Sequence, residues 1–225
     1  MPTAPLTRAG LARLVDHTLL KPEASAAAVR AAAAEAVRLG CASVCVSSAR
    51  LVDAAPVVRD TGTVLCTVIG FPAGAVLTAG KVAEARAALA LGATELDMVA
   101  DLGRVVDGDL VGVQHDIAAV RAVTPADHVL KVILETAALS DEQVVLACRA
   151  AEQAGADFVK TSTGFHPTGG ATTEAVRLLH QSVPALGVKA SGGIRSLAAA
   201  QAMLDAGATR LGMSATAAVL AELPE

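Results

Sequence analysis

The stretch QAGADFVKTS at residues 153–162 passes from a helix-like run, through a glycine, into a short apolar run typical of a buried strand. The same pattern recurs as RLGCASVCV at 38–46, ALGATELDMV at 90–99 and DAGATRLGMS at 205–214. Glycine suits the end of a helix because it adopts the left-handed backbone conformation at little cost. The four junction glycines are 52, 63 and 52 residues apart, which leaves room for two strand–helix units between neighbouring junctions.

Four further strand candidates lie midway between these junctions, at residues 17–20, 64–69, 129–134 and 187–190. Helix-like patterns separate them, and Ser140 followed by Gln143 predicts a capping box at one helix start. Eight strands alternating with eight helices are typical of an α/β protein whose strands close into a (βα)8 TIM barrel. Because no linker-like segment divides the chain, we expect one domain over residues 1–225.

Composition restricts the partners of this chain. Its formal net charge is -4 and its basic residues are scattered, whereas binding to nucleic acid requires clustered lysine and arginine. Stacking on single strands is also disfavoured, since there are 3 Phe and neither Trp nor Tyr. The longest uncharged stretch, residues 61–80, contains four Gly and one Pro and does not suit a membrane helix.

The 4 cysteines form no CxxC pair, so we expect buried, reduced thiols rather than a zinc or redox site. The N-terminal segment lacks the apolar run of a signal peptide. Both features predict a cytoplasmic protein.

Three charged residues interrupt the apolar strands: Lys160, Lys189 and Asp97. In this fold the active site lies at the carboxyl ends of the strands, and burying an unpaired charge is costly. Two lysines on adjacent strands disfavour each other's charged form, so one can be neutral near pH 7 and attack a carbonyl. Asp97 then balances the remaining cation and shuttles protons. These residues predict carbon–carbon bond chemistry through an imine and enamine, although a strand-end lysine is more often a salt-bridged or snorkelling residue.

Lys131 and Glu135 share one face of the strand at 129–134. Lys131 lies near the start of that strand, at the end of a barrel that contributes to stability, so we expect a structural ion pair there. Glu135 lies at the strand's carboxyl end, where we expect it to join the active-site network.

A phosphate site is the second signal. The loop SGGIR at residues 191–195 and the strand end around Gly212 and Ser214 correspond to the two places where barrels often hold phosphate. Glycine there lets backbone N–H groups approach an anion closely.

The chain resembles the deoxyribose-phosphate aldolase family over nearly its whole length. Seven blocks carry the resemblance, in the family's order: Asp16–Pro22, Val68–Gly74, Glu95–Val99, Lys131–Thr136, Phe158–Phe165, Val188–Arg195 and Gly207–Ser214.

The resemblance implies reversible cleavage of 2-deoxy-D-ribose 5-phosphate to acetaldehyde and D-glyceraldehyde 3-phosphate, with no metal or other cofactor and commonly as a homodimer. It implies that Lys160 forms the Schiff base, that Lys189 perturbs it and that Asp97 transfers protons. It also implies a group of substrate-binding residues: Asp16 and Thr18 lining the pocket, and Gly164, Gly192, Gly193, Gly212 and Ser214 at the phosphate.

The chain departs from the family pattern at the site. Asp101 replaces a neutral amide and adds negative charge near the barrel mouth, while Ala215 and Thr216 replace a serine and a glycine. The absence of Tyr removes the tail tyrosine that assists proton transfer in some members. Two alternatives therefore stay open, another lysine-dependent aldolase and a catalytically silent phosphate-binding barrel.

Overall fold

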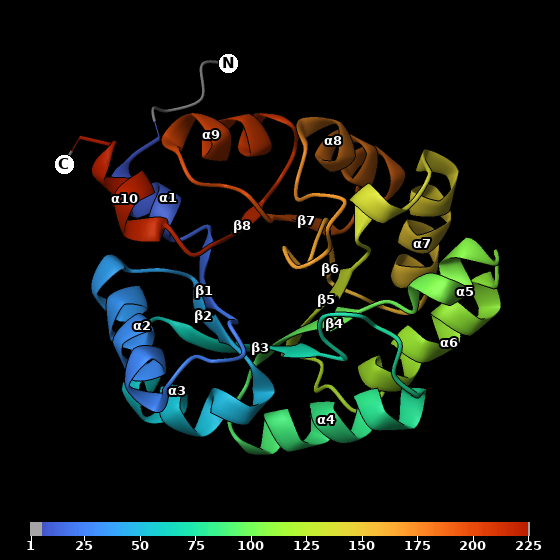
Figure 1. The fold of residues 1–225 in the computed structure, drawn as a ribbon, viewed down its shortest axis with the longest axis horizontal. Helices are drawn as coiled ribbons and strands as arrows, with labels where there is room; N and C mark the ends of the chain where they lie inside the picture. The colour runs from blue at the N-terminus through green and yellow to red at the C-terminus, as the bar shows by residue number, and fades with distance from the viewer. Residues whose placement is uncertain (1–5, 225) are drawn as a thin grey trace.

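The computed structural model describes residues 6–224, and these form eight parallel strands that close into one barrel (Figure 1). Every strand pairs in parallel with its neighbour in the sequence, and β1 pairs with β8 to close the sheet. The predicted (βα)8 barrel is therefore confirmed. The strands are β1 (Val15–Leu19), β2 (Ser43–Val46), β3 (Val64–Ile69), β4 (Glu95–Val99), β5 (Val129–Ile133), β6 (Phe158–Lys160), β7 (Gly187–Ser191) and β8 (Arg210–Met213).

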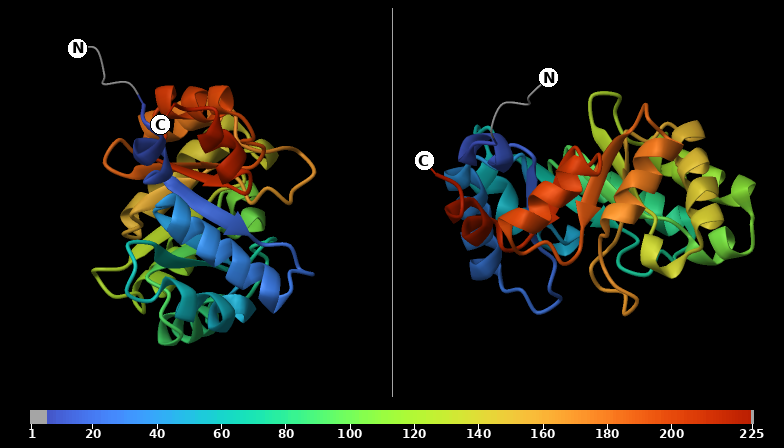
Figure 2. Two further views of the ribbon diagram at one scale, coloured as in Figure 1. Left: turned by 90° about the vertical axis from the view of Figure 1, so that its left-hand side faces the viewer. Right: turned by 90° about the horizontal axis from the view of Figure 1, so that it is seen from above.

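The helices form a ring outside the barrel (Figures 1 and 2). Ten α-helices occur among residues 6–224, two more than predicted, because α1 precedes the first strand and two helices follow β4. The helices are α1 (Arg8–Ala12), α2 (Ala26–Leu39), α3 (Leu51–Val58), α4 (Thr78–Ala90), α5 (Leu102–Val106), α6 (Leu110–Arg121), α7 (Asp141–Gln153), α8 (Thr173–Ser182), α9 (Leu197–Asp205) and α10 (Thr216–Ala221). Short 3-10 turns, η1 (Ser48–Arg50) and η2 (Thr136–Ala138), follow β2 and β5. None of the helices in this part of the chain is long and apolar enough to cross a membrane.

The local signals in the sequence correspond to real element ends. All four junction glycines have positive φ, between 70° and 111°, as a helix-terminating left-handed residue requires. Ser140 and Gln143 form the predicted capping box at the start of α7. The first strand begins two residues earlier than expected, because Val15 and Asp16 pair with Leu211 and Gly212 of β8.

The main core lies between the outer faces of the strands and the helices, and it is built largely from Val, Leu and Ala. The predicted inner face of α7 is buried at Val144, Cys148 and Ala151. Polar residues occupy the barrel interior instead. The register places Lys160 opposite Lys189 and Asp97 opposite Lys131, so the interior charges of neighbouring strands lie at similar heights.

Candidate active site

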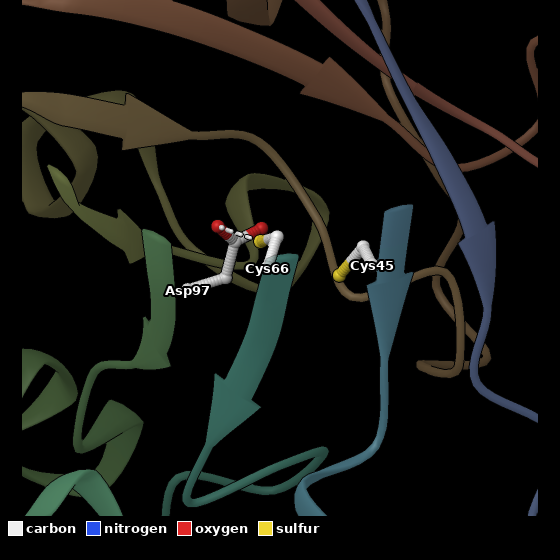
Figure 3. Close-up of side chains that lie close together, drawn as sticks. All are labelled: Cys45, Cys66 and Asp97. Atoms are coloured by element: carbon white, nitrogen blue, oxygen red, sulfur yellow. Dashed lines mark hydrogen bonds between the residues drawn. The ribbon is translucent and has the colours of Figure 1, made fainter. Parts of the chain in front are cut away.

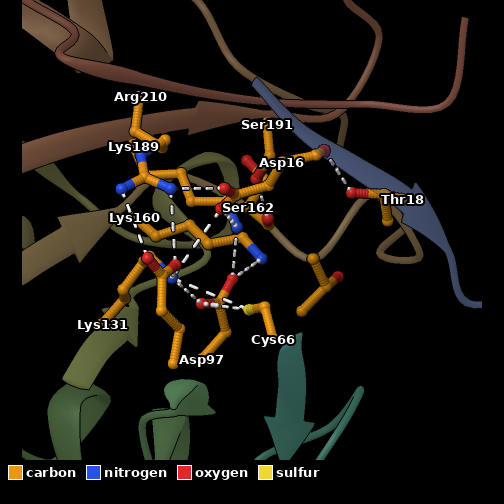
Figure 4. Close-up of polar contacts among 12 residues, drawn as sticks. Asp16, Thr18, Cys66, Asp97, Lys131, Lys160, Ser162, Lys189, Ser191 and Arg210 are labelled. Atoms are coloured by element: carbon orange, nitrogen blue, oxygen red, sulfur yellow. Dashed lines mark hydrogen bonds and ion pairs between the residues drawn. The ribbon is translucent and has the colours of Figure 1, made fainter. Parts of the chain in front are cut away.

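Asp97, on β4, is the carboxylate at which three lysines meet (Figure 4). Its Oδ2 lies 2.7 Å from Nζ of Lys160 and 2.6 Å from Nζ of Lys189. Its Oδ1 lies 2.9 Å from Nζ of Lys131. Burial alone would raise the pKa of Asp97, but the neighbouring lysines, Lys131 foremost, hold that pKa well below its ordinary value. Asp97 is therefore an ionised carboxylate at neutral pH.

Lys160 and Lys189 are neighbours on β6 and β7 and share one oxygen of Asp97. Burial disfavours the charged form of Lys189, yet the carboxylates of Asp16 and Asp97 outweigh it and raise the pKa of Lys189. At Lys189, any repulsion from Lys160 is therefore outweighed by the two carboxylates. Lys189 is a fixed cation, because Asp16 is a second carboxylate partner that the strand pattern alone did not suggest.

Lys131 takes part in the same network, contrary to the expectation of a separate structural ion pair. Its Nζ lies 2.5 Å from Oε2 of Glu95 as well as 2.9 Å from Asp97. Burial disfavours the charged form of Lys131, but nearby negative groups, of which Asp97 has the largest effect, raise its pKa well above the ordinary value. The physical reason is register: Lys131 lies opposite Asp97 on the neighbouring strand, so its amine meets that carboxylate inside the barrel.

Two residues of this network were not identified from the sequence, Glu95 on β4 and Arg210 on β8. Arg210 Nη1 lies 2.6 Å from Oδ1 of Asp16, and its Nη2 lies 3.3 Å from Oε1 of Glu95. The guanidinium also lies over the ring of Phe158, 5.7 Å from its centroid. Period-two alternation, which places Glu95 and Asp97 on one strand face, is the sequence signal that identifies Glu95.

A pocket of about 260 Å³ opens at the carboxyl ends of β1, β6, β7 and β8. Most of the predicted substrate-binding residues line it, together with Lys160: Thr18, Gly164, Gly192, Gly193, Gly212 and Ser214. Asp16 does not line this pocket. It is fully buried below it, where Lys131, Lys189 and Arg210 outweigh burial and lower the pKa of Asp16.

The loops at this pocket have the geometry of an anion cradle. Gly192 and Gly193 follow β7 with φ of 93° and 85°, and Gly164 has φ of 80°. Consecutive glycines in this region can turn their N–H groups toward one concavity. The side chains of Lys21 and Arg195 also line the pocket and add positive charge. The pocket therefore suits a phosphorylated ligand whose other end reaches Lys160.

Glu135 organises a neighbouring loop, and within residues 6–224 no hydrogen bond or ion pair joins its carboxylate to the lysines. Its carboxylate accepts hydrogen bonds from N of Thr163 at 3.2 Å and from Oγ1 of the same residue at 2.5 Å. The residue itself has φ of 52°, in the left-handed region. The expectation that Glu135 joins the active-site network therefore needs correction: it holds the loop after β6, one residue before Gly164.

Asp101 contributes less negative charge to the mouth than its sequence position suggested. Its side chain caps α5 by accepting from N of Arg104, and its Oδ2 lies 3.3 Å from Nε of the same arginine. The replacement of an amide by a carboxylate is thus compensated locally.

Two aromatic rings meet at the rim of the pocket. Phe71, after β3, and Phe165, after β6, form an edge-to-face pair with centroids 5.2 Å apart and an interplanar angle of 83°. Phe165 also lines the pocket. The pair therefore gives one side of the pocket an apolar wall.

Buried thiols lie beside Asp97 (Figure 3). Cys45 and Cys66 are opposite one another on β2 and β3, and their sulfur atoms lie within 4.8 Å of each other and of an oxygen of Asp97. Burial, together with a hydrogen bond to Cys45, raises the pKa of Cys66. This donor set does not fit a metal ion, because both oxygens of Asp97 already accept from ammonium groups that would repel one. All four cysteines are free and buried, as expected.

The fold and the lysine cluster together define a class, the (βα)8 barrels that hold buried amines at the carboxyl ends of their strands. Within that class, the chain belongs to the DeoC/LacD family of aldolases, whose family profile matches residues 11–220.

Named relatives agree with this membership. A deoxyribose-phosphate aldolase of Kocuria rhizophila is 60% identical over 216 residues, 96% of this chain and 97% of that relative. One of Corynebacterium diphtheriae is 53% identical over 97% of this chain and 99% of that relative. The tetrameric deoxyribose phosphate aldolase of Aeropyrum pernix superposes with a TM-score of 0.90 at 35% identity, covering 96% of this chain and 92% of that one.

Proposed function

We propose that this chain catalyses the reversible, metal-independent cleavage of 2-deoxy-D-ribose 5-phosphate to acetaldehyde and D-glyceraldehyde 3-phosphate. The observation that carries the proposal is the position of Lys160. Its amine lies at the base of a pocket suited to phosphate and is hydrogen-bonded to an ionised carboxylate. The family membership and the names of the relatives support the same substrate.

The reaction begins when the neutral amine of Lys160 attacks C1 of the open-chain sugar aldehyde. The resulting carbinolamine loses water to give a protonated imine. A base then removes the proton of the C3 hydroxyl, and the C2–C3 bond breaks. Its electron pair moves toward the imine nitrogen, so D-glyceraldehyde 3-phosphate leaves and an enamine stays on Lys160.

The enamine is then protonated at C2, and water hydrolyses the imine to free acetaldehyde and Lys160. Asp97 is ionised and, because its pKa is well below the ordinary value, a weak base, so it suits holding the amines of Lys160 and Lys189 by hydrogen bonds rather than taking up or donating the proton itself. Lys189 stays charged and shares Oδ2 of Asp97 with Lys160, so it suits orienting the water that relays a proton to C2 rather than giving up its own proton. This relay requires no tyrosine, in agreement with the composition.

The phosphate group occupies the cradle formed by the loops after β6, β7 and β8. Backbone N–H groups near Gly164, Gly192 and Gly193 supply neutral donors, and Ser214 supplies a hydroxyl. Replacement of the family's serine and glycine by Ala215 and Thr216 removes one donor. We expect turnover to depend on the substrate phosphate, which comparison of deoxyribose with its 5-phosphate measures.

Trapping with borohydride tests the proposal. Incubation with 2-deoxy-D-ribose 5-phosphate and reduction should leave an adduct that peptide masses assign to Lys160, partly in the phosphate-free form that marks bond cleavage. Lys160→Ala and Lys160→Arg should both lose the adduct and turnover. The arginine variant controls for charge, because it keeps a cation beside Asp97 but forms no imine.

Two outcomes would contradict the assignment. Substantial turnover by Lys160→Ala excludes Lys160 as the nucleophile. Binding of the sugar phosphate without any adduct indicates the alternative, a silent phosphate-binding barrel, while adducts with other aldehydes alone indicate a different lysine-dependent aldolase.

We further propose that residues 1–225 act as one catalytic domain, as a homodimer, in the cytoplasm. Free buried thiols agree with a reducing compartment. Val106 and Val111 are 57% and 77% exposed on α5 and α6, and a subunit contact would cover such side chains. Light scattering tests the assembly: twice the chain mass is expected, and the mass of one chain would contradict it.

A further inference from the structure

The charged side chains inside the barrel form a closed ring in which the signs alternate (Figure 4). Asp97 contacts Lys131 at 2.9 Å, and Lys131 in turn contacts Glu95 at 2.5 Å. The ring continues through Arg210 to Asp16, with contacts of 3.3 and 2.6 Å. Lys189 contacts Asp16 and closes the ring at 2.6 Å from Asp97. Three carboxylates and three cations therefore balance one another.

Lys160 lies outside this ring. Its contact is with Oδ2 of Asp97, an oxygen that Lys189 already occupies. Within residues 6–224 the cluster thus holds three carboxylates and, if every basic group were protonated, four cations. At 3% exposure, Lys160 gains little from solvent, and an unmatched buried charge is unfavourable. Loss of one proton removes the excess, and Lys160 is the member whose proton no ring contact retains.

We propose that Glu95 and Arg210 are positioning residues which close the ring, leave Lys160 as its unmatched amine, and thereby set the pH at which Lys160 becomes nucleophilic. This inference rests on the proposed role of Lys160 as the nucleophile. Neither residue lines the substrate pocket, so both act through the lysines rather than on the sugar.

Other titratable groups face the same space. Cys45 and Cys66 approach from β2 and β3, and Cys66 Sγ lies 3.4 Å from Oδ1 of Asp97. Lys21 lines the pocket from the loop after β1. Burial and the hydrogen bond to Cys45 raise the pKa of Cys66 and keep that thiol uncharged, whereas the hydrogen bond with Cys66 lowers the pKa of Cys45. The ring that we propose counts Cys45 as a neutral thiol, and Lys21 is exposed and solvated.

The ring predicts pH shifts of opposite sign for its anions and cations. Arg210→Gln leaves three carboxylates for three lysines, so Lys160 should keep its proton to higher pH. Glu95→Gln leaves two carboxylates for four cations, so Lys160 should lose its proton at lower pH. The pH midpoint for loss of the Lys160 proton should move by about 1 pH unit in each single variant. The double variant again has one excess cation, so its midpoint should return toward the wild-type value.

The measurement is the rate of adduct formation on Lys160 with 2-deoxy-D-ribose 5-phosphate and cyanoborohydride, followed by intact mass from about pH 5 to about pH 10. The pH profile of kcat/KM provides a second reading, and circular dichroism confirms that each variant is folded. Lys131→Met removes another ring cation and should also shift the midpoint upward, so the prediction can be tested even if Arg210→Gln does not fold.

Two controls separate the ring from general effects. Arg104→Gln removes the same charge from an exposed ion pair and should leave the midpoint in place. Cys45→Ser removes the neighbouring thiol and should also leave it in place. A shift in Cys45→Ser as large as that of the ring variants would assign the balancing charge to the thiol and overturn the proposal.

The outcomes distinguish this inference from the proposed function. If the wild-type adduct does not map to Lys160, the proposed nucleophile is wrong. If it does map there, but the anion and cation variants shift the midpoint in the same direction or not at all, the ring has only a structural role and the inference fails alone.

Discussion

Lys189 differs from Lys160 by its second carboxylate. Both amines contact Oδ2 of Asp97, but only Lys189 also contacts Asp16. The two carboxylates outweigh burial and raise its pKa, which makes Lys189 a persistent positive charge next to the proposed nucleophile. A fixed cation at that position favours the neutral form of Lys160 and stabilises the charge of Asp97.

Replacement of Lys189 by methionine should therefore shift the reaction to higher pH. The variant leaves three carboxylates for three remaining basic groups, so Lys160 holds its proton more strongly. We expect kcat/KM at neutral pH to fall at least about tenfold and to recover partly as the pH rises. A pH–rate profile with unchanged midpoints would exclude this role for Lys189.

Gly192 shows how closely two loops approach at the phosphate cradle. A Cβ at this position would lie 2.9 Å from Cα of Gly170, and φ is 93°. Gly192→Ala should raise KM for deoxyribose 5-phosphate about tenfold, with a smaller effect on unphosphorylated deoxyribose. Steady-state kinetics with both sugars measures this difference. Gly62→Ala is the matched control, because nothing lies within 4 Å of its Cβ; equal KM values for the two variants would contradict a phosphate role for Gly192.

At the scale of elements, hydrogen bonds join the loop after β5 to the loop after β6. Glu135, two residues after β5, accepts hydrogen bonds from N and Oγ1 of Thr163, which is next to Gly164. N of Thr136 also donates to O of Thr161, at 2.9 Å. The carboxyl end of β6, which carries Lys160, is thus positioned by hydrogen bonds between the two loops as well as by the pairing of β5 and β6 in the sheet.

Helix α7 begins with a reciprocal cap whose energy can be measured. Ser140 accepts from N of Gln143 at 3.3 Å, and the Gln143 side chain accepts from N of Ser140 at 2.9 Å. Ser140→Ala should lower the free energy of unfolding by about 1 kcal/mol in urea titrations, since it leaves a helical N–H without its partner. Ser182→Ala is the control. The hydroxyl of Ser182 donates to O of Leu178 within a helix, and we expect its removal to lower the free energy of unfolding by less. Equal losses would mean that the cap contributes nothing specific.

At the scale of the whole molecule, the charge ring connects five of the eight strands through the barrel interior. Its members come from β1, β4, β5, β7 and β8, so the same ion pairs that surround Lys160 also hold the barrel together. Removing one partner of a buried pair is expected to destabilise the fold, because the other charge is left uncompensated.

Acid should weaken the barrel through this ring. The pKa values of Asp16 and Asp97 lie below their ordinary value of 3.8, so the unfolded chain binds protons before the folded one does. Their contribution to stability is thus present above about pH 4 and is lost as the pH falls toward the pKa values that Asp16 and Asp97 have in the folded protein. Urea unfolding at a series of pH values should give a steep acid limb that is shallower in Asp97→Asn. Asp107→Asn, an exposed change, should keep the wild-type slope, and equal slopes for both variants would contradict the prediction.

The sequence by itself determined the barrel and its carboxyl-terminal site. Helix-ending glycines, short apolar strands and the spacing between them are local features, and the (βα)8 topology follows because consecutive parallel strands pair with their neighbours. Lys160, Lys189 and Asp97 stood out for a local reason too: a charge within an apolar strand requires compensation.

Only the tertiary structure decided which charge compensates which. Asp16, the partner of Lys189, comes from a strand far away in the chain, so the strand patterns could not show that pairing. Glu95, the partner of Lys131, lies on the preceding strand, but which amine it contacts depended on the direction of the side chains inside the barrel. The roles of Glu135 and Arg210 depended on side-chain reach across the barrel. Electrostatic interaction depends on distance in space, and barrel closure brings β1 and β8 together from opposite ends of the sequence.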